Sequence, residues 1–137
     1  MRLFVGVVVV AIIQNVVDWL LNAFFLKAHY QAVPQNFLME GVNPVKPIIA
    51  DILLALFFVF LYDRVASAFS GITGGLTYGF LTGLLVYVPH NLLVLYYVSA
   101  FPRAIPWTWM IGGIIIFLIN GLALGLIWKY VKAKPAG

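Results

Sequence analysis

The sequence contains no cysteine and very few charged residues. Cysteine is absent from the 137-residue chain, and Asp, Glu, Lys and Arg together make up only 9% of it. The absence of cysteine excludes disulfide bonds, thiolate catalysis and the cysteine-ligated classes of zinc and iron–sulfur protein. Soluble domains carry roughly 25% charged residues, so a chain this poor in charge cannot cover its surface in water. Its natural solvent is a lipid bilayer.

Long apolar runs separated by polar segments make up most of the chain. Hydrophobic residues form 64% of it, and the mean hydropathy is +1.07. A membrane-spanning helix needs about 20 apolar residues, so the runs predict one domain, residues 1–137, with four such helices. We expect an all-α integral membrane protein, an up-down bundle of two helical hairpins. The predicted helices cover approximately residues 3–26, 48–69, 74–100 and 106–131, with a polar loop at 27–46.

Glycine recurs at a spacing of four in the third predicted helix and again in the fourth. Residues four apart lie on one helix face, so each series forms a groove along which another helix can approach closely. The pattern predicts that these two helices pack on each other, and any remaining glycine surface would suit a partner. The glycines concerned are Gly71, Gly75, Gly79 and Gly83, then Gly113, Gly121 and Gly125.

Basic residues are distributed unequally between the two sides of the predicted bundle. The side with both termini holds Arg2, Arg64, Lys129, Lys132 and Lys134, and the other side holds Lys27, Lys46 and Arg103. Basic residues favour the cytoplasmic side, so we expect both termini in the cytoplasm and the protein in the bacterial cytoplasmic (inner) membrane. The net charge of +4 does not indicate a nucleic-acid partner, because the tail lysines suit anionic lipid headgroups.

A line of polar residues on the first predicted helix is the strongest candidate site. Gln14, Asp18 and Asn22 are four residues apart and Asn15 is three before Asp18, so all four share one face. An aspartate near the centre of a span costs about 2.5–3.5 kcal/mol, so Asp18 must face the bundle interior or water. Asp18 is then either a proton- or cation-binding carboxylate, or a carboxyl that bonds to neighbouring amides and fixes helix register.

Asp51 lies close to the start of the second predicted helix. We expect it in the first turn, where a carboxylate complements the positive end of the helix dipole. The alternative is that Asp51 forms a carboxylate pair with Asp18.

His90 follows a proline inside the third predicted helix. Pro89 lacks an N–H and frees the carbonyl of the residue four before it, so His90 and Asn91 flank a candidate kink. The imidazole would suit an ion or proton site, or the axial position of a tetrapyrrole metal. The alternative is a histidine that bonds across the bundle to Asp18 or Asn120. Bound lipid is the other cofactor we expect.

Aromatic residues mark both ends of the fourth predicted helix. Trp107 and Trp109 lie at one end, and Trp128 and Tyr130 lie at the other. Such belts are typical of residues at the membrane–water interface. We therefore interpret these four side chains as membrane anchors.

The overall pattern resembles an uncharacterised group of small bacterial four-helix integral membrane proteins. The resemblance rests on Asp18-x3-Asn22 in an apolar first helix, on the polar proline-containing loop and on the glycine-rich third and fourth helices. That group brings no known activity. In size and in the carboxylate of its first helix, the chain is also similar to the small multidrug resistance transporters, which implies a proton- or cation-coupled carrier.

The sequence shows no recognisable active site, so we do not expect an enzyme. It has no histidine pair at metal-ligand spacing and no serine with a base beside it. We expect an accessory or structural membrane protein that packs as a small subunit within a larger respiratory or photosynthetic complex. The alternative is a small carrier, dimeric, with Asp18 as the binding carboxylate. The expected partners are the lipid bilayer and either other membrane subunits or a second copy.

Overall fold

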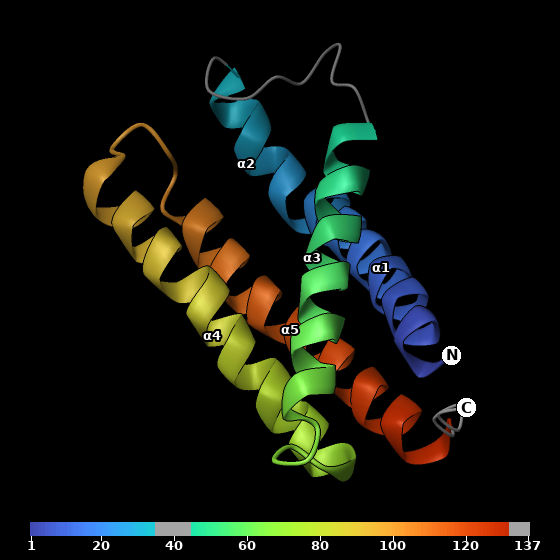
Figure 1. The fold of residues 1–137 in the computed structure, drawn as a ribbon. Helices are drawn as coiled ribbons and strands as arrows, with labels where there is room; N and C mark the ends of the chain where they lie inside the picture. Colours follow the sequence, from blue (N-terminus) through green and yellow to red (C-terminus); the bar gives the residue numbers. More distant parts are fainter. Residues whose placement is uncertain (35–44, 132–137) are drawn as a thin grey trace.

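The protein is a bundle of four helices that are each long and apolar enough to cross a membrane. The structure, a computed structural model, describes residues 1–34 and 45–131, and the candidate spans are Arg2–Ala32, Val45–Val65, Gly71–Tyr97 and Ala104–Tyr130. The predicted all-α membrane fold is therefore confirmed. Successive helices run in opposite directions (Figure 1). We call the end with Arg2 and Tyr130 the terminal end, and the opposite end the loop end.

The first span continues further than its hydrophobicity predicts. It consists of α1 Arg2–Leu20, a π-helical turn η1 Leu21–Leu26 and α2 Lys27–Ala32. The prediction that the helix ends at residue 26 is wrong, because lysine, alanine and glutamine are good helix formers and carry the helix on. Residues 35–44 of the predicted loop lie outside the described residues.

The other three helices each begin two or three residues earlier than predicted. They are α3 Val45–Val65, α4 Gly71–Tyr97 and α5 Ala104–Tyr130. Pro47 does not mark the start of α3, because backbone N–H groups in a first turn have no helical partner and a proline is tolerated there. Gly71 begins α4 with φ 69°, a conformation that favours glycine.

Helices α4 and α5 make the most extensive contact in the bundle. A Cβ atom on Gly79 would overlap the carbonyl oxygen of Phe117, and one on Gly121 would overlap the carbonyl oxygen of Gly75. Gly125 lies against the backbone of Gly71 in the same way. The two helices therefore approach backbone to backbone along these glycines.

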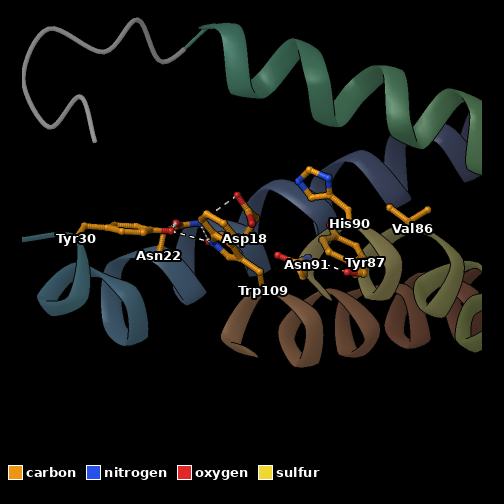
Figure 2. Close-up of a pocket in the computed structure, with 8 residues that line it drawn as sticks. All are labelled: Asp18, Asn22, Tyr30, Val86, Tyr87, His90, Asn91 and Trp109. Atoms are coloured by element: carbon orange, nitrogen blue, oxygen red, sulfur yellow. Dashed lines mark hydrogen bonds between the residues drawn. The ribbon is translucent and has the colours of Figure 1, made fainter. Parts of the chain in front are cut away.

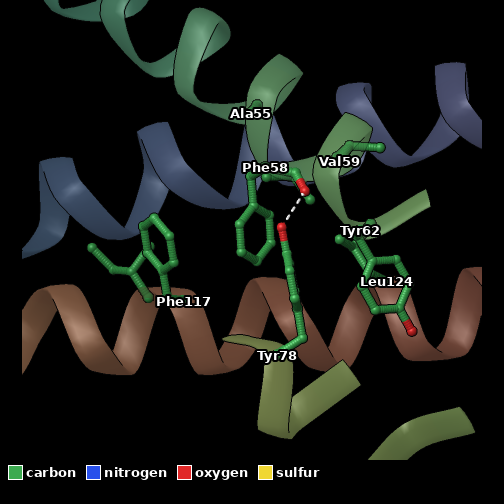
Figure 3. Close-up of a cluster of buried hydrophobic side chains, with 9 residues drawn as sticks. Ala55, Phe58, Val59, Tyr62, Tyr78, Phe117 and Leu124 are labelled. Atoms are coloured by element: carbon green, nitrogen blue, oxygen red, sulfur yellow. Dashed lines mark hydrogen bonds between the residues drawn. The ribbon is translucent and has the colours of Figure 1, made fainter. Parts of the chain in front are cut away.

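The remaining helices join this pair differently. The backbone of α1 packs against both α3 and α5, whereas α3 reaches α4 and α5 through four large side chains that we call the aromatic cluster: Phe58, Tyr62, Tyr78 and Phe117 (Figure 3). The ring centroid of Phe58 lies 4.9 Å from those of both Tyr78 and Phe117. The Tyr78 hydroxyl donates a hydrogen bond of 2.8 Å to the Phe58 carbonyl. The cluster fills the bundle between its middle and its terminal end.

Candidate functional site

A cavity that we call the polar cavity opens between the first span, α4 and α5 near the loop end. Its volume is about 430 Å³. The side chains that line it come from all three elements (Figure 2). They are Asp18, Asn22, Tyr30, Val86, Tyr87, His90, Asn91 and Trp109.

Three of these side chains form a chain of hydrogen bonds that ends at Asp18. The indole Nε1 of Trp109 donates to the Tyr30 hydroxyl at 3.0 Å, and that hydroxyl donates to Oδ1 of Asn22 at 2.8 Å. Nδ2 of Asn22 in turn donates to Oδ2 of Asp18 at 3.2 Å. Every donor in this series of hydrogen bonds points toward the carboxylate. The series therefore fixes the position of Asp18 and supplies its carboxylate with one hydrogen-bond donor.

The π-helical turn η1 lies directly beside Asp18. Nδ2 of Asn22 also donates to the backbone carbonyl of Asp18 at 2.8 Å, so a side chain shares the acceptor that the helix ladder uses there. Isolated π turns of this kind occur frequently at functional sites. The turn leads into α2, which contains Tyr30 and brings its hydroxyl to the side chain of Asn22.

A second cavity, of about 650 Å³, lies between the first span and α3. Asp18 borders it as well, and so does Asp51. The prediction that Asp51 lies in the first turn of its helix is wrong, because α3 begins at Val45 and has no acidic residue in that turn. The two carboxylates instead line one cavity.

The four polar residues that share one face of the first helix contact different parts of the bundle. Gln14 is only 2% exposed, and its Oε1 accepts a hydrogen bond of 3.1 Å from Nδ2 of Asn120 on α5. Asn15 donates to the Ala11 carbonyl of its own helix at 2.9 Å and lines the second cavity. Of the four residues, Asp18 and Asn22 line the polar cavity.

His90 and Asn91 both line the polar cavity but differ in exposure. Asn91 is 3% exposed and His90 is exposed. Within the part of the chain that the structure describes, His90 forms no hydrogen bond with Asp18 or Asn120, and the Asn120 amide bonds to Gln14 instead. The interpretation of His90 as a bridge across the bundle is therefore wrong.

A tetrapyrrole does not fit the lining beside His90. A ring placed in the polar cavity, which His90 lines, would meet the Asp18 carboxylate and the Asn91 amide. Polar groups pressed against an apolar ring without hydrogen-bond partners are strongly unfavourable. We therefore assign no pigment to this site.

Four cavity residues, Tyr30, Val86, Tyr87 and Trp109, escaped prediction, and for two of them the sequence pattern favours a different role. Trp109 suits a membrane anchor, and Tyr30 falls in a segment expected to be a loop. Asn22 and Tyr30 are eight residues apart, a spacing that puts both on one helix face. Extending the first helix beyond residue 26 would have brought Tyr30 to the polar line.

Within residues 1–34 and 45–131, no three His, Cys, Asp or Glu side chains gather into a metal site. The site is thus a carboxylate with amide, phenol, indole and imidazole neighbours. The resemblance to small bacterial four-helix membrane proteins stays a prediction. Comparison of the chain with family models, with curated proteins and with solved structures finds no match.

Proposed function

We propose that this membrane protein is a small carrier that binds a proton or a cation at Asp18. The observation that supports it most directly is the position of this carboxylate, which borders both cavities. Among the described residues, Asp18 accepts a single side-chain hydrogen bond, from Asn22, and the lining of the two cavities contains no lysine or arginine there. A carboxylate inside a membrane needs a positive partner, and here a bound proton or cation would provide it.

The arrangement of the bundle supports a carrier that is open toward one side. The polar cavity lies near the loop end, whereas the aromatic cluster fills the interior toward the terminal end. A cation at Asp18 would therefore exchange with the loop side in this conformation. Passage to the terminal side requires the aromatic cluster to separate.

The glycines favour this function over one based on helix docking. In the described chain, every glycine except Gly71 faces atoms of this same chain, so these glycines form no small-residue surface for a partner. Gly112, for example, lies against Leu21, and Gly113 lies against the ring of Tyr87. The glycine faces thus hold the carrier together.

Reconstitution into liposomes tests the role of Asp18. With a pH-sensitive dye inside the vesicles and an imposed pH gradient, we expect the wild type to move protons and Asp18→Asn to lose about tenfold or more of that rate, since the amide cannot take up a proton. Thr82→Val is the matched control, because its hydroxyl bonds only within its own helix. A folded Asp18→Asn protein with the wild-type rate would contradict the proposal.

A second candidate function is that of an accessory subunit in a larger respiratory or photosynthetic complex. An apolar groove of about 300 Å³ between α3 and α4, lined among others by Phe57, Leu61 and Leu85, favours it. A membrane helix of another subunit would suit this groove. Extraction from native membranes in mild detergent separates the candidates: a large assembly supports the subunit, and a monomer or dimer supports the carrier.

A further inference from the structure

Besides Asp18, a second residue of the polar cavity has a hydrogen-bond acceptor, and this acceptor has no donor. Nδ2 of Asn91 donates to the Tyr87 carbonyl at 2.8 Å, but Oδ1 of the same amide accepts no hydrogen bond from the described chain. The side chain is 3% exposed, and in Figure 2 its oxygen points toward Asp18 and Trp109. Buried acceptors are nearly always satisfied, so this one indicates a missing donor.

Two acceptors therefore belong to residues that line the cavity, and one of the two is charged. Asp18 provides a carboxylate and Asn91 provides a carbonyl, while the lining residues Trp109 and Tyr30 already donate to other groups of the chain. A group that complements both acceptors must be positive and must carry more than one N–H. An ammonium group meets both conditions, and a quaternary nitrogen meets only the first.

The size and the walls of the cavity indicate an organic ligand. About 430 Å³ is far more than a dehydrated metal ion fills, and it falls in the range of small-molecule sites. The rings of Tyr30, Tyr87 and Trp109 line it, and aromatic faces attract cations. We propose that the polar cavity binds an organic ammonium ion whose N–H groups donate to both Asp18 and Asn91.

Such an ammonium group has two sources, a soluble amine or an aminophospholipid headgroup. Asn91 lies six residues before the end of α4, which is about 9 Å of helix. That depth is close to the boundary between headgroups and acyl chains. The inference rests on the proposed function, in which Asp18 binds the cation, and it adds the requirement for N–H donors.

Calorimetric titration of the full-length protein in phosphatidylcholine nanodiscs tests this inference. The probes are phenethylamine, its quaternary trimethyl derivative and phenethyl alcohol. We expect the amine to bind about tenfold or more tightly than the quaternary ion, because a site built to hydrogen-bond rejects an analogue that cannot donate. The alcohol should not bind measurably. Asp18→Asn should abolish binding of the amine, and Thr82→Val should leave it unchanged.

Asn91→Leu separates the hydrogen bond from the charge. This variant should bind the quaternary ion as the wild type does and should lose the preference for the amine. If this variant does not fold, the order of the affinities of the three probes for the wild type tests the inference. Equal binding of amine and quaternary ion, or no binding of either, overturns the inference. Proton movement that still depends on Asp18 would then leave the proposed function standing.

Nanodiscs that also contain phosphatidylethanolamine identify the source. A lipid headgroup in the cavity should compete with phenethylamine and weaken its apparent affinity for the wild type. The same lipid should have less effect on Asn91→Leu, which lacks the second acceptor. An unchanged affinity supports a soluble amine as the ligand.

Discussion

At the scale of single residues, Tyr78 connects α4 to α3. The centroid of its ring lies 4.9 Å from the ring centroid of Phe58 and 5.0 Å from that of Tyr62. Its hydroxyl is the donor to the Phe58 carbonyl. Since the backbones of α3 and α4 contact each other little, these side-chain contacts provide the connection.

Removing that hydroxyl should weaken the bundle measurably. We expect Tyr78→Phe to lower the free energy of unfolding by about 1 kcal/mol, since the ring stays and one buried hydrogen bond is lost. Titration of the protein from mild detergent into dodecyl sulfate, followed by circular dichroism, measures the difference. Thr77→Val, an exposed neighbour whose hydroxyl bonds to Thr73, is the control. Identical transitions for Tyr78→Phe and the wild type would contradict this role.

At the scale of helices, α4 and α5 form the unit on which the others pack. Their close approach leaves no volume for side chains at Gly75, Gly79 and Gly121. The first span then covers α5, and Gln14 bonds to Asn120 between them. Both partners of this bond are buried at 2% and 0% exposure, so the contact also fixes the register of the two helices.

A bulky residue at the α4–α5 contact should prevent folding. Gly79→Leu drives a side chain into the Phe117 backbone, and such overpacking against main chain exceeds the 1–3 kcal/mol that is typical of core side chains, by an amount on the order of several kcal/mol. We expect aggregated protein on size exclusion. Thr77→Leu, two residues away and exposed, should elute as the wild type does. A monodisperse Gly79→Leu protein would show that the helices can separate without loss of fold.

The spans could be predicted from the sequence because apolar runs long enough to cross a bilayer are typical of membrane helices and of little else. The position of Asp51 within its helix could not be predicted, because it depends on where α3 begins. Pro47 is compatible with more than one first residue of that helix. The partners of Gln14 and His90 depend on the rotation of each helix about its axis. Apart from the polar line on the first span, these helices are apolar on nearly every side, so the pattern contains little information on the rotation of the others. Asp18 was identifiable because a carboxylate in such a run is conspicuous.

At the scale of the whole molecule, the two ends of the bundle differ in packing. At the terminal end, Arg2 pairs with Asp63 at 3.0 Å and lies over the ring of Trp128. Arg64 and Lys129 lie at the same end and are exposed. At the loop end, the polar cavity separates the helices. Each end has three basic residues in the described chain, and Lys132 and Lys134 follow the last helix in the sequence. We therefore propose that the terminal end faces the cytoplasm.

The absence of cysteine allows this orientation to be measured directly. Ser67→Cys places one thiol in the turn between α3 and α4 at the terminal end, and Ser99→Cys places one between α4 and α5 at the loop end; both serines are exposed. A membrane-impermeant maleimide should label Ser99→Cys in intact cells and should label Ser67→Cys only after the membrane is opened. The reverse pattern would assign the terminal end to the outside.

The bond between Gln14 and Asn120 has a consequence for biosynthesis. The two residues are 106 positions apart, so Gln14 enters the membrane long before the ribosome has made its partner. Trp109, which begins the hydrogen-bond chain to Asp18, also belongs to the last helix. A nascent chain that has inserted only its first three helices therefore has neither contact. The polar cavity is completed in the last stage of membrane insertion, after release of α5, and an unfinished chain lacks the wall that Trp109 provides.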